Sequence, residues 1–222
     1  MDGLHDLLNT SDNKPIVTFL QEVGDEGRAT FHPFITPENE DKSNIKPIHI
    51  CDREADIFEF IQLVKEKNQD FVVRMCQDRR ITNSKLTIKK TLSHQTSFGK
   101  IELEIYDRKK RKYRKSIIDL KAAAVNIRPP QRLPGAKKNK LEEQTVYALK
   151  ATEVTEGVDS NQRVEWYLIT SLPINNAYQA VNALNIYKKR WLIEDFFKVL
   201  KTCFRVENAR LATGSRLKNF IA

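Results

Sequence analysis

The sequence predicts an α/β fold in which a parallel sheet covered by a helix is followed by a β-rich stretch and a long helix. A short apolar run, an amphipathic segment and a second β-rich run follow one another within residues 47–75, and about thirty residues is the size of a βαβ unit. Alternating apolar and polar residues between 99 and 170 indicate antiparallel strands. Residues 177–204 contain no Gly or Pro and are typical of a helix.

The composition is that of a foldable, basic chain. It has 222 residues, 40% of them hydrophobic, which is enough for one core or for one core carrying an insertion. Lys and Arg number 38 against 29 Asp and Glu, which gives a formal net charge of +9. This excess favours a polyanionic partner, nucleic acid first.

The sequence contains no signal for a membrane or for secretion. No apolar run approaches the ~20 residues that a membrane span needs, and residues 1–14 lack a basic start followed by an apolar stretch. The three cysteines, Cys51, Cys76 and Cys203, are widely spaced and fit neither a metal motif nor a disulfide framework. We therefore expect no membrane partner and a cytoplasmic location.

Residues 1–45 form an N-terminal segment that the sequence leaves unassigned. Within it, residues 15–23 look like a strand and the GDEG sequence at 24–27 like a turn. Residues 29–36 are a candidate return strand, at an edge because they contain a proline.

Residues 46–98 are expected to form the first part of the core. The run PIHIC at 47–51 is a buried strand, the segment 54–68 has apolar residues at helical spacing, and 70–75 is a second strand. The carboxyl ends of strands in such sheets are where functional sites gather.

Asp52 stands at such a strand end and is a candidate metal carboxylate. The alternative is that Asp52 caps the helix that follows it. Asp56 is expected to face solvent in the first helical turn, where a negative charge suits the helix dipole.

Residues 99–170 are expected to form a β-rich basic insertion. Between its first two strands lies DRKKRKYRK, residues 107–115, in which seven of nine residues are basic. This run suits phosphate contact without sequence readout, and the alternative is a solvated hairpin tip. The expected strands are 101–106, 116–127, 145–154 and 164–170.

Residues 171–222 are expected to hold one long helix, 177–204, and a C-terminal part. On a helical wheel, four residues of this helix fall within an arc of roughly 60° and a strip about 21 Å long. Such a strip is matched to phosphates beside a metal-bound reaction centre. The alternative is an exposed face with an i, i+4 ion pair from Arg190 to Glu194. The four residues are Tyr187, Arg190, Glu194 and Lys201.

Three parts of the chain resemble a known family. CDREADIFEF at 51–60 followed by FVVR at 71–74 resembles the second catalytic-Asp segment of bacterial insertion-sequence transposases of the DDE type. EWYLITSLPI at 165–174 resembles the strand that precedes the signature helix in that family. The spacing Tyr187-x2-Arg190-x3-Glu194-x6-Lys201 matches the YREK signature of the same family.

The resemblance, which covers roughly 46–210, implies a ribonuclease-H-like (retroviral-integrase-like) α/β core, incomplete at its N-terminus and interrupted by the β-rich insertion. It also implies a two-metal site for Mg²⁺ or Mn²⁺, with Asp52 and Glu194 as two of three carboxylate ligands. Tyr187, Arg190 and Lys201 would hold DNA phosphates.

The resemblance assigns further roles to two partly apolar strands. Trp166 lies where the family places an aromatic that stacks on a flipped base, and the alternative is a core tryptophan. Arg74 would meet DNA phosphate or brace the site, against the alternative of a surface salt bridge. Trp191 and Phe197 are expected to belong to the core.

The third carboxylate that the resemblance requires is not evident upstream of Asp52. None of the upstream aspartates lies in an apolar strand of the expected kind; they are Asp2, Asp6, Asp12 and Asp25. We therefore expect a truncated, inactive or nearly inactive transposase that binds transposon-end DNA, with a homodimer or a full-length transposase as further partners. The alternatives are a non-catalytic DNA-binding or inhibitory fragment and a metal-dependent nuclease of the same fold.

Overall fold

The computed structural model describes most of the chain from residue 46 to residue 203. The described residues are 46–107, 110–130 and 141–203, with the short strand positions 17–18, 22–23 and 29–30. By compactness the chain divides into two units, residues 1–188 and residues 189–222. The sequence also predicts a basic loop broken by Pro and Gly at 128–140, and this segment lies mostly outside the described residues.

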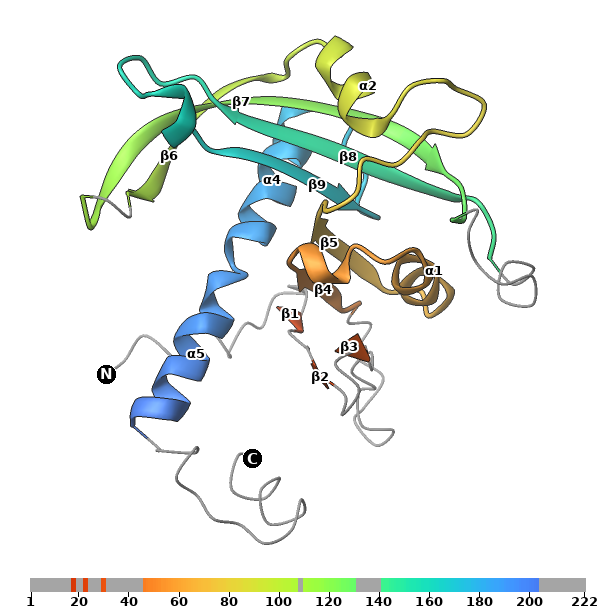
Figure 1. Cartoon of the computed structure of the whole chain (residues 1–222), viewed down its shortest axis with the longest axis horizontal. Helices are drawn as coiled ribbons and strands as arrows, with labels where there is room; N and C mark the ends of the chain where they lie inside the picture. Colours follow the sequence, from red (N-terminus) through yellow and green to blue (C-terminus); the bar gives the residue numbers. More distant parts are fainter. Residues whose placement is uncertain are drawn as a thin grey trace, which may run out of the picture. The chain divides into compact units, whose positions relative to one another are not determined.

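The first unit is built on a seven-stranded mixed sheet (Figure 1). The strand order is β1-β4-β5-β9-β8-β7-β6; the first three strands are parallel and the others pair antiparallel. A separate pair, β2 with β3, is antiparallel. The bounds are β1 Val17–Thr18, β2 Glu22–Val23, β3 Ala29–Thr30, β4 Ile48–Cys51, β5 Asp70–Arg74, β6 Gly99–Asp107, β7 Lys112–Ile127, β8 Gln144–Glu153 and β9 Glu165–Thr170.

The strand–helix–strand unit predicted at 47–75 is confirmed. Strand β4 leads through a 3-10 turn, η2 (Arg53–Ala55), into α1 (Phe58–Glu66) and back to β5, which lies parallel to β4. Helix α1 begins at Phe58, later than the predicted start at residue 54, because the 3-10 turn occupies the first residues of the expected helix. Strand β1 extends the parallel sheet on the other side of β4.

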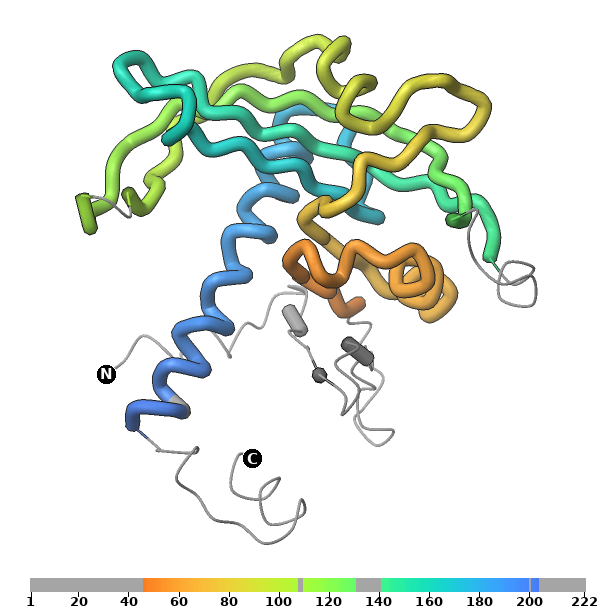
Figure 2. The backbone as a smooth tube through the Cα atoms, in the orientation of Figure 1, coloured from red at the N-terminus to blue at the C-terminus, as the bar shows by residue number. Residues whose placement is uncertain are grey.

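The four strands predicted between 99 and 170 are confirmed as β6 to β9, and they belong to the same sheet as the parallel strands. Strand β9 returns to pair with β5, with Val73 registered against Ile169 (Figure 2). The β-rich stretch is therefore continuous with the core sheet. Helix α2 (Ile88–His94) precedes it and was not predicted.

Alternate residues along the strands bury two faces of the sheet, as expected for a sheet with helices on both sides. In β5, Val72 packs on the side of α4 (Ala177–Lys188) and Val73 on the side of α1 and α2. In β9, Leu168 and Ile169 divide in the same way. The described part of the first unit therefore has three layers.

The single helix predicted over 177–204 is wrong; the chain forms two helices there. Helix α4 ends at Lys188 and α5 spans Trp191–Thr202. The junction is closed by i→i−3 backbone bonds, in which Leu192 N donates to Lys189 O at 3.0 Å and Ile193 N donates to Arg190 O at 3.3 Å. Three consecutive cations stand at the C-terminus of α4, where the negative end of the helix macrodipole favours positive charge. They are Lys188, Lys189 and Arg190.

A buried ion pair ties the β6–β7 hairpin to the end of β8. The Arg114 guanidinium binds both carboxylate oxygens of Glu153, whose side chain is fully buried. Val164 N also donates to Glu153 at 3.0 Å. These donors, Arg114 first, lower the pKa of Glu153 to about 2.

We predict that Glu153→Gln lowers the free energy of unfolding by about 3 kcal/mol at neutral pH, because Arg114 loses its buried bidentate partner and keeps the more distant Asp107 carboxylate, at 3.9 Å. The folded-state pKa of Glu153 lies below the ordinary value of 4.5, so its stabilisation is present above pH 4.5 and is lost as the pH falls toward 2. Urea unfolding across this range should show the difference between wild type and variant shrinking.

The matched control is Glu165→Gln, whose carboxylate pairs with Lys150 at 3.0 Å but is 48% exposed. An exposed pair contributes less than about 1 kcal/mol. An equal loss in both variants, or a difference independent of pH, would contradict the assigned role of Glu153.

Candidate functional site

The carboxyl ends of β4 and β5 bring two of the predicted site residues to one edge of the sheet. Cys51 is registered with Val73, so Asp52 and Arg74 are the next positions on neighbouring parallel strands, which lie about 4.8 Å apart. Both side chains are partly buried. The structure therefore places a carboxylate beside a guanidinium-bearing position at this edge.

Asp52 also caps the turn that follows it. Its Oδ1 accepts a hydrogen bond from Arg53 N at 2.9 Å, and its backbone is extended. This is the capping arrangement that the sequence offered as the alternative to metal binding. The cap orients the Asp52 carboxylate. Its role as a metal ligand stays a prediction.

The prediction that Asp56 faces solvent is wrong. Asp56 is 2% exposed, because α1 begins only at Phe58 and Asp56 ends the preceding 3-10 turn instead of standing in the first helical turn. Its Oδ2 accepts hydrogen bonds from the backbone N–H groups of Cys76 and Gln77 at 2.6 and 2.8 Å.

Arg79 completes this buried cluster. Its guanidinium pairs with Asp56 Oδ1 and also donates to the Asp56 backbone carbonyl at 2.6 Å. The segment after β5 is thereby fastened to the segment after β4. Asp56, which was expected to face solvent, and Arg79 together fix the backbone that follows Asp52 and the backbone that follows Arg74.

Tyr187 and Trp166 meet on the α4 side of the sheet. Their ring centroids are 6.1 Å apart with an interplanar angle of 64°, an edge-to-face contact. Tyr187 is only 5% exposed and Trp166 packs against the same cluster of buried residues. Trp166 therefore has the core packing that was its alternative, while DNA contact by either ring stays a prediction.

The second unit carries the other residues of the predicted strip on α5. Arg190 Nη2 donates to Glu194 Oε1 at 2.8 Å, the i, i+4 pair that the sequence offered as the alternative. Glu194 and Lys201 are exposed. Because Tyr187 belongs to the first unit and Glu194 to the second, the continuous strip stays a prediction.

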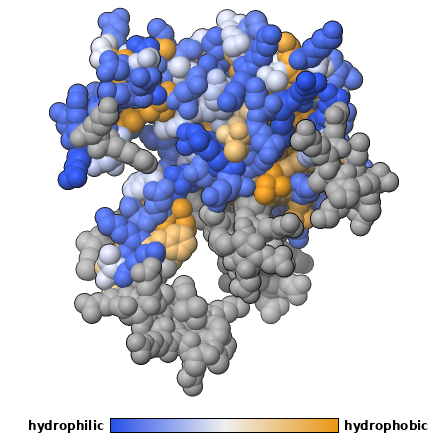
Figure 3. Space-filling view, in the orientation of Figure 1, coloured by the Kyte–Doolittle hydropathy of each residue, from blue (hydrophilic) through white to orange (hydrophobic). Residues whose placement is uncertain are grey.

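The prediction that Trp191 and Phe197 belong to the core is wrong for the described residues. They are 49% and 51% exposed, and apolar side chains are visible on α5 in Figure 3. Both side chains lie on α5, which packs against no other described helix or strand of its unit. A single helix cannot bury its own apolar face.

Asp52 and Glu194 fit a hard divalent cation by the chemistry of their donors. Carboxylate oxygens are the ligands that Mg²⁺ and Mn²⁺ prefer, and neither side chain is fully buried. Within the part of the chain that the structure describes, no three or more His, Cys, Asp or Glu side chains gather closely enough to hold a metal.

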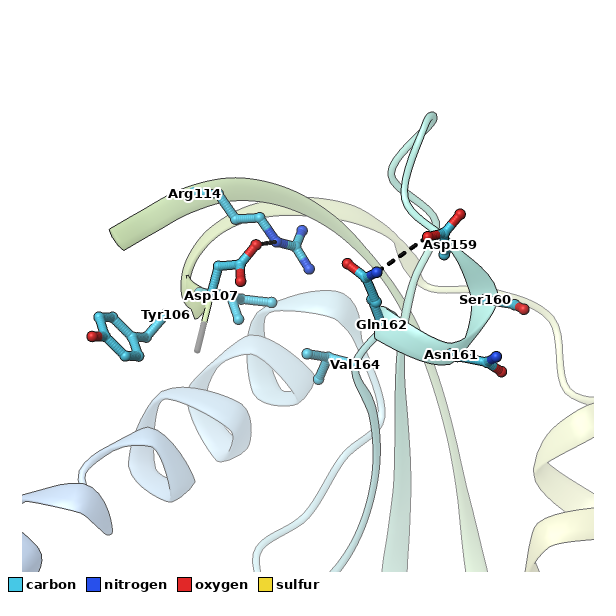
Figure 4. Close-up of a pocket in the computed structure, with 9 residues that line it drawn as sticks. Tyr106, Asp107, Arg114, Asp159, Ser160, Asn161, Gln162 and Val164 are labelled. Atoms are coloured by element: carbon cyan, nitrogen blue, oxygen red, sulfur yellow. Dashed lines mark hydrogen bonds and ion pairs between the residues drawn. The ribbon is translucent and has the colours of Figure 1, made fainter. Parts of the chain in front are cut away.

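A cavity of about 710 Å³ lies away from this edge, between the β6–β7 hairpin and the connection from β8 to β9 (Figure 4). Arg114 and Asp107 reach into it, and Gln162 donates to Asp159 at 3.1 Å on its other side. The positive charge of Arg114 is neutralised by Glu153, so the cavity is not arranged for an anion. None of the residues predicted for the metal site or for the helical strip lines it, whereas Asp107 and Arg114 belong to the basic run 107–115.

A family model described as "Transposase DDE domain" matches residues 10–222. The match spans both units and includes every residue that the sequence analysis singled out for the site. In addition, none of the helices among the described residues is long and apolar enough to cross a membrane.

We predict that Asp56→Asn lowers the free energy of unfolding by about 3 kcal/mol, because it leaves Arg79 buried beside a neutral partner. Asp52→Asn, four residues away, should change stability by less than about 1 kcal/mol, since Asn caps helices as well as Asp does. Urea denaturation of the two variants measures this contrast. Equal destabilisation by the two variants would show that Asp52, too, is part of the structural clamp.

Proposed function

The chain belongs to the DDE transposase domain family, and from this premise we propose that it cleaves and joins DNA by metal-dependent phosphodiester chemistry. The family implies a ribonuclease-H-like fold and DNA as the partner. The observation that carries the proposal is the position of Asp52, at the carboxyl end of β4 beside Arg74 and anchored by the Asp56–Arg79 pair.

Asp52 and Glu194 would hold Mg²⁺ or Mn²⁺ through their carboxylate oxygens. When bound, such ions activate the attacking water or 3′-hydroxyl and stabilise the leaving oxygen. Arg74, next to Asp52 in register, would hold a DNA phosphate at the same edge. The Asp56–Arg79 pair keeps the two strand ends fixed and lowers the cost of ordering them when DNA binds.

The spacing of Tyr187, Arg190, Glu194 and Lys201 supports a finer assignment, to the transposases that carry the YREK signature. In this assignment Arg190 and Lys201 contact phosphates, and Glu194 contributes the carboxylate of the signature. Strands β6 to β9 would be the insertion that separates β5 from the signature helix. Because the sequence offers two of the three expected carboxylates, we expect slow cleavage.

One observation favours a second candidate function, DNA binding without cleavage. The Glu194 carboxylate is engaged by Arg190 at 2.8 Å, an arrangement that partly neutralises it. In this alternative the basic surface of the domain binds DNA, and Glu194 stabilises helix α5 through its ion pair with Arg190. The two candidates differ in what Glu194→Gln does to cleavage.

We predict that Asp52→Asn and Glu194→Gln each reduce nicking of supercoiled plasmid in Mn²⁺ by about 100-fold, because a metal site contributes several kcal/mol to the transition state. The matched control is Glu59→Gln, an exposed acid on α1, which should cut as the wild type does. Equal cutting by all four proteins would reject the site. A wild type that binds DNA but never nicks it would support the second candidate.

A further inference from the structure

The tip of the β6–β7 hairpin exposes two aromatic rings. Tyr106 and Tyr113 are cross-strand partners, with centroids 5.3 Å apart and an interplanar angle of 65°. They are 48% and 65% exposed. Tyr106 also lines the cavity, and Figure 4 shows its ring turned away from Arg114 and Asp107.

Cations lie between the two tyrosines in the sequence. Lys110, Arg111 and Lys112 lie in the tip between the two rings along the chain, and all three are exposed. Arg111 has a φ of +51°, the left-handed conformation of a tight turn, and Lys110 N donates to Asp107 Oδ1 at 3.0 Å to close it. The tip thus carries exposed cations that are neighbours of the two tyrosines along the chain.

The base of the hairpin is held in place. Arg114, directly after Tyr113, binds Glu153 on β8, and Lys115 pairs with Glu102 on β6 at 2.9 Å. These two cations therefore hold the described strands of the hairpin, on which the tyrosine pair lies. A preordered surface loses less entropy on binding.

We propose that the tyrosine pair and the adjacent cations bind an unpaired DNA strand. Exposed aromatic rings interleaved with Lys and Arg are the chemistry that holds single strands, whose bases stack on the rings while phosphates meet the cations. In a duplex, neighbouring base pairs cover each base face, so the rings would gain little from it. This inference deepens the proposed function, on which it rests, because strand cleavage and joining expose unpaired ends.

The test measures binding of the full chain to a 20-nucleotide unpaired DNA and to the duplex of the same sequence, by fluorescence anisotropy in EDTA. The double variant Tyr106→Ala/Tyr113→Ala should weaken binding to the unpaired strand by at least about fivefold and leave duplex binding within about twofold. The variant Tyr113→Trp, which keeps an aromatic face, should retain binding. The matched control is Tyr178→Ala, a tyrosine of α4 that is 81% exposed.

A second measurement uses the wild-type protein, so it does not depend on how the variants fold. Ultraviolet cross-linking to unpaired DNA carrying 5-iodouracil, followed by mass spectrometry, should place the cross-links at Tyr106 or Tyr113. Cross-links only elsewhere, equal weakening for both DNA forms, or an equal effect of Tyr178→Ala would overturn the inference.

The outcomes separate this inference from the proposed function. Because the assay contains no divalent metal, binding is measured whether or not the chain cleaves DNA. Tyrosine-dependent binding without plasmid nicking in Mn²⁺ would retain the inference and reject cleavage. Nicking without a tyrosine-dependent preference for the unpaired strand would do the reverse.

Discussion

The hydrogen bonding of β9 to β5 is the interaction on which the first unit depends. It joins three parallel strands to four antiparallel ones, so that a single sheet carries helices on both faces. The register of Val73 with Ile169 also fixes the point at which the chain leaves the sheet. Because α4 follows β9 after a short connection, this register determines where Tyr187 lies relative to Trp166.

Two buried acids of the described chain stabilise the fold through ion pairs. Asp56 and Glu153 are enclosed, and each is neutralised by an arginine from another segment, Arg79 or Arg114. A buried carboxylate without such a partner would cost several kcal/mol, so each pair fixes the approach of two segments. Asp52 is only partly buried and closes a turn by accepting a hydrogen bond from Arg53 N. Asp52 therefore contributes less to the fold than the two enclosed acids.

The sequence predicted the elements whose signal is local. Alternation of apolar and polar residues identified β6 to β9, and the apolar run before Asp52 identified β4. Both signals are local, because a buried strand face requires apolar residues within the strand itself. The pairing of β9 with β5 could not be predicted, since it joins positions about a hundred apart and leaves no periodic trace. The burial of Asp56 was missed for the same reason: its partner Arg79 lies in a different segment.

The helix break shows a further limit of local signals. A Gly- and Pro-free segment was predicted as one helix, whereas α4 ends at Lys188 and α5 begins at Trp191. Propensity favours a helix on both sides of the junction and does not distinguish one helix from two. What differs is the environment, because the Ala180 side of α4 is buried against the sheet while Trp191 on α5 is exposed.

Net charge alone overstates the surface that can meet DNA. Of the formal +9, several cations already serve the fold: Arg79 and Arg114 are committed to buried carboxylates, and Lys115 and Lys150 to exposed ones. A cation whose charge is matched within the protein releases few counterions when a phosphate approaches, so it adds little to salt-dependent affinity. What matters is therefore the position of the cations, and in particular whether they lie near groups that can bind the bases of a nucleic acid. Among the described residues the hairpin tip meets this condition, because its exposed cations are neighbours of two exposed rings along the chain.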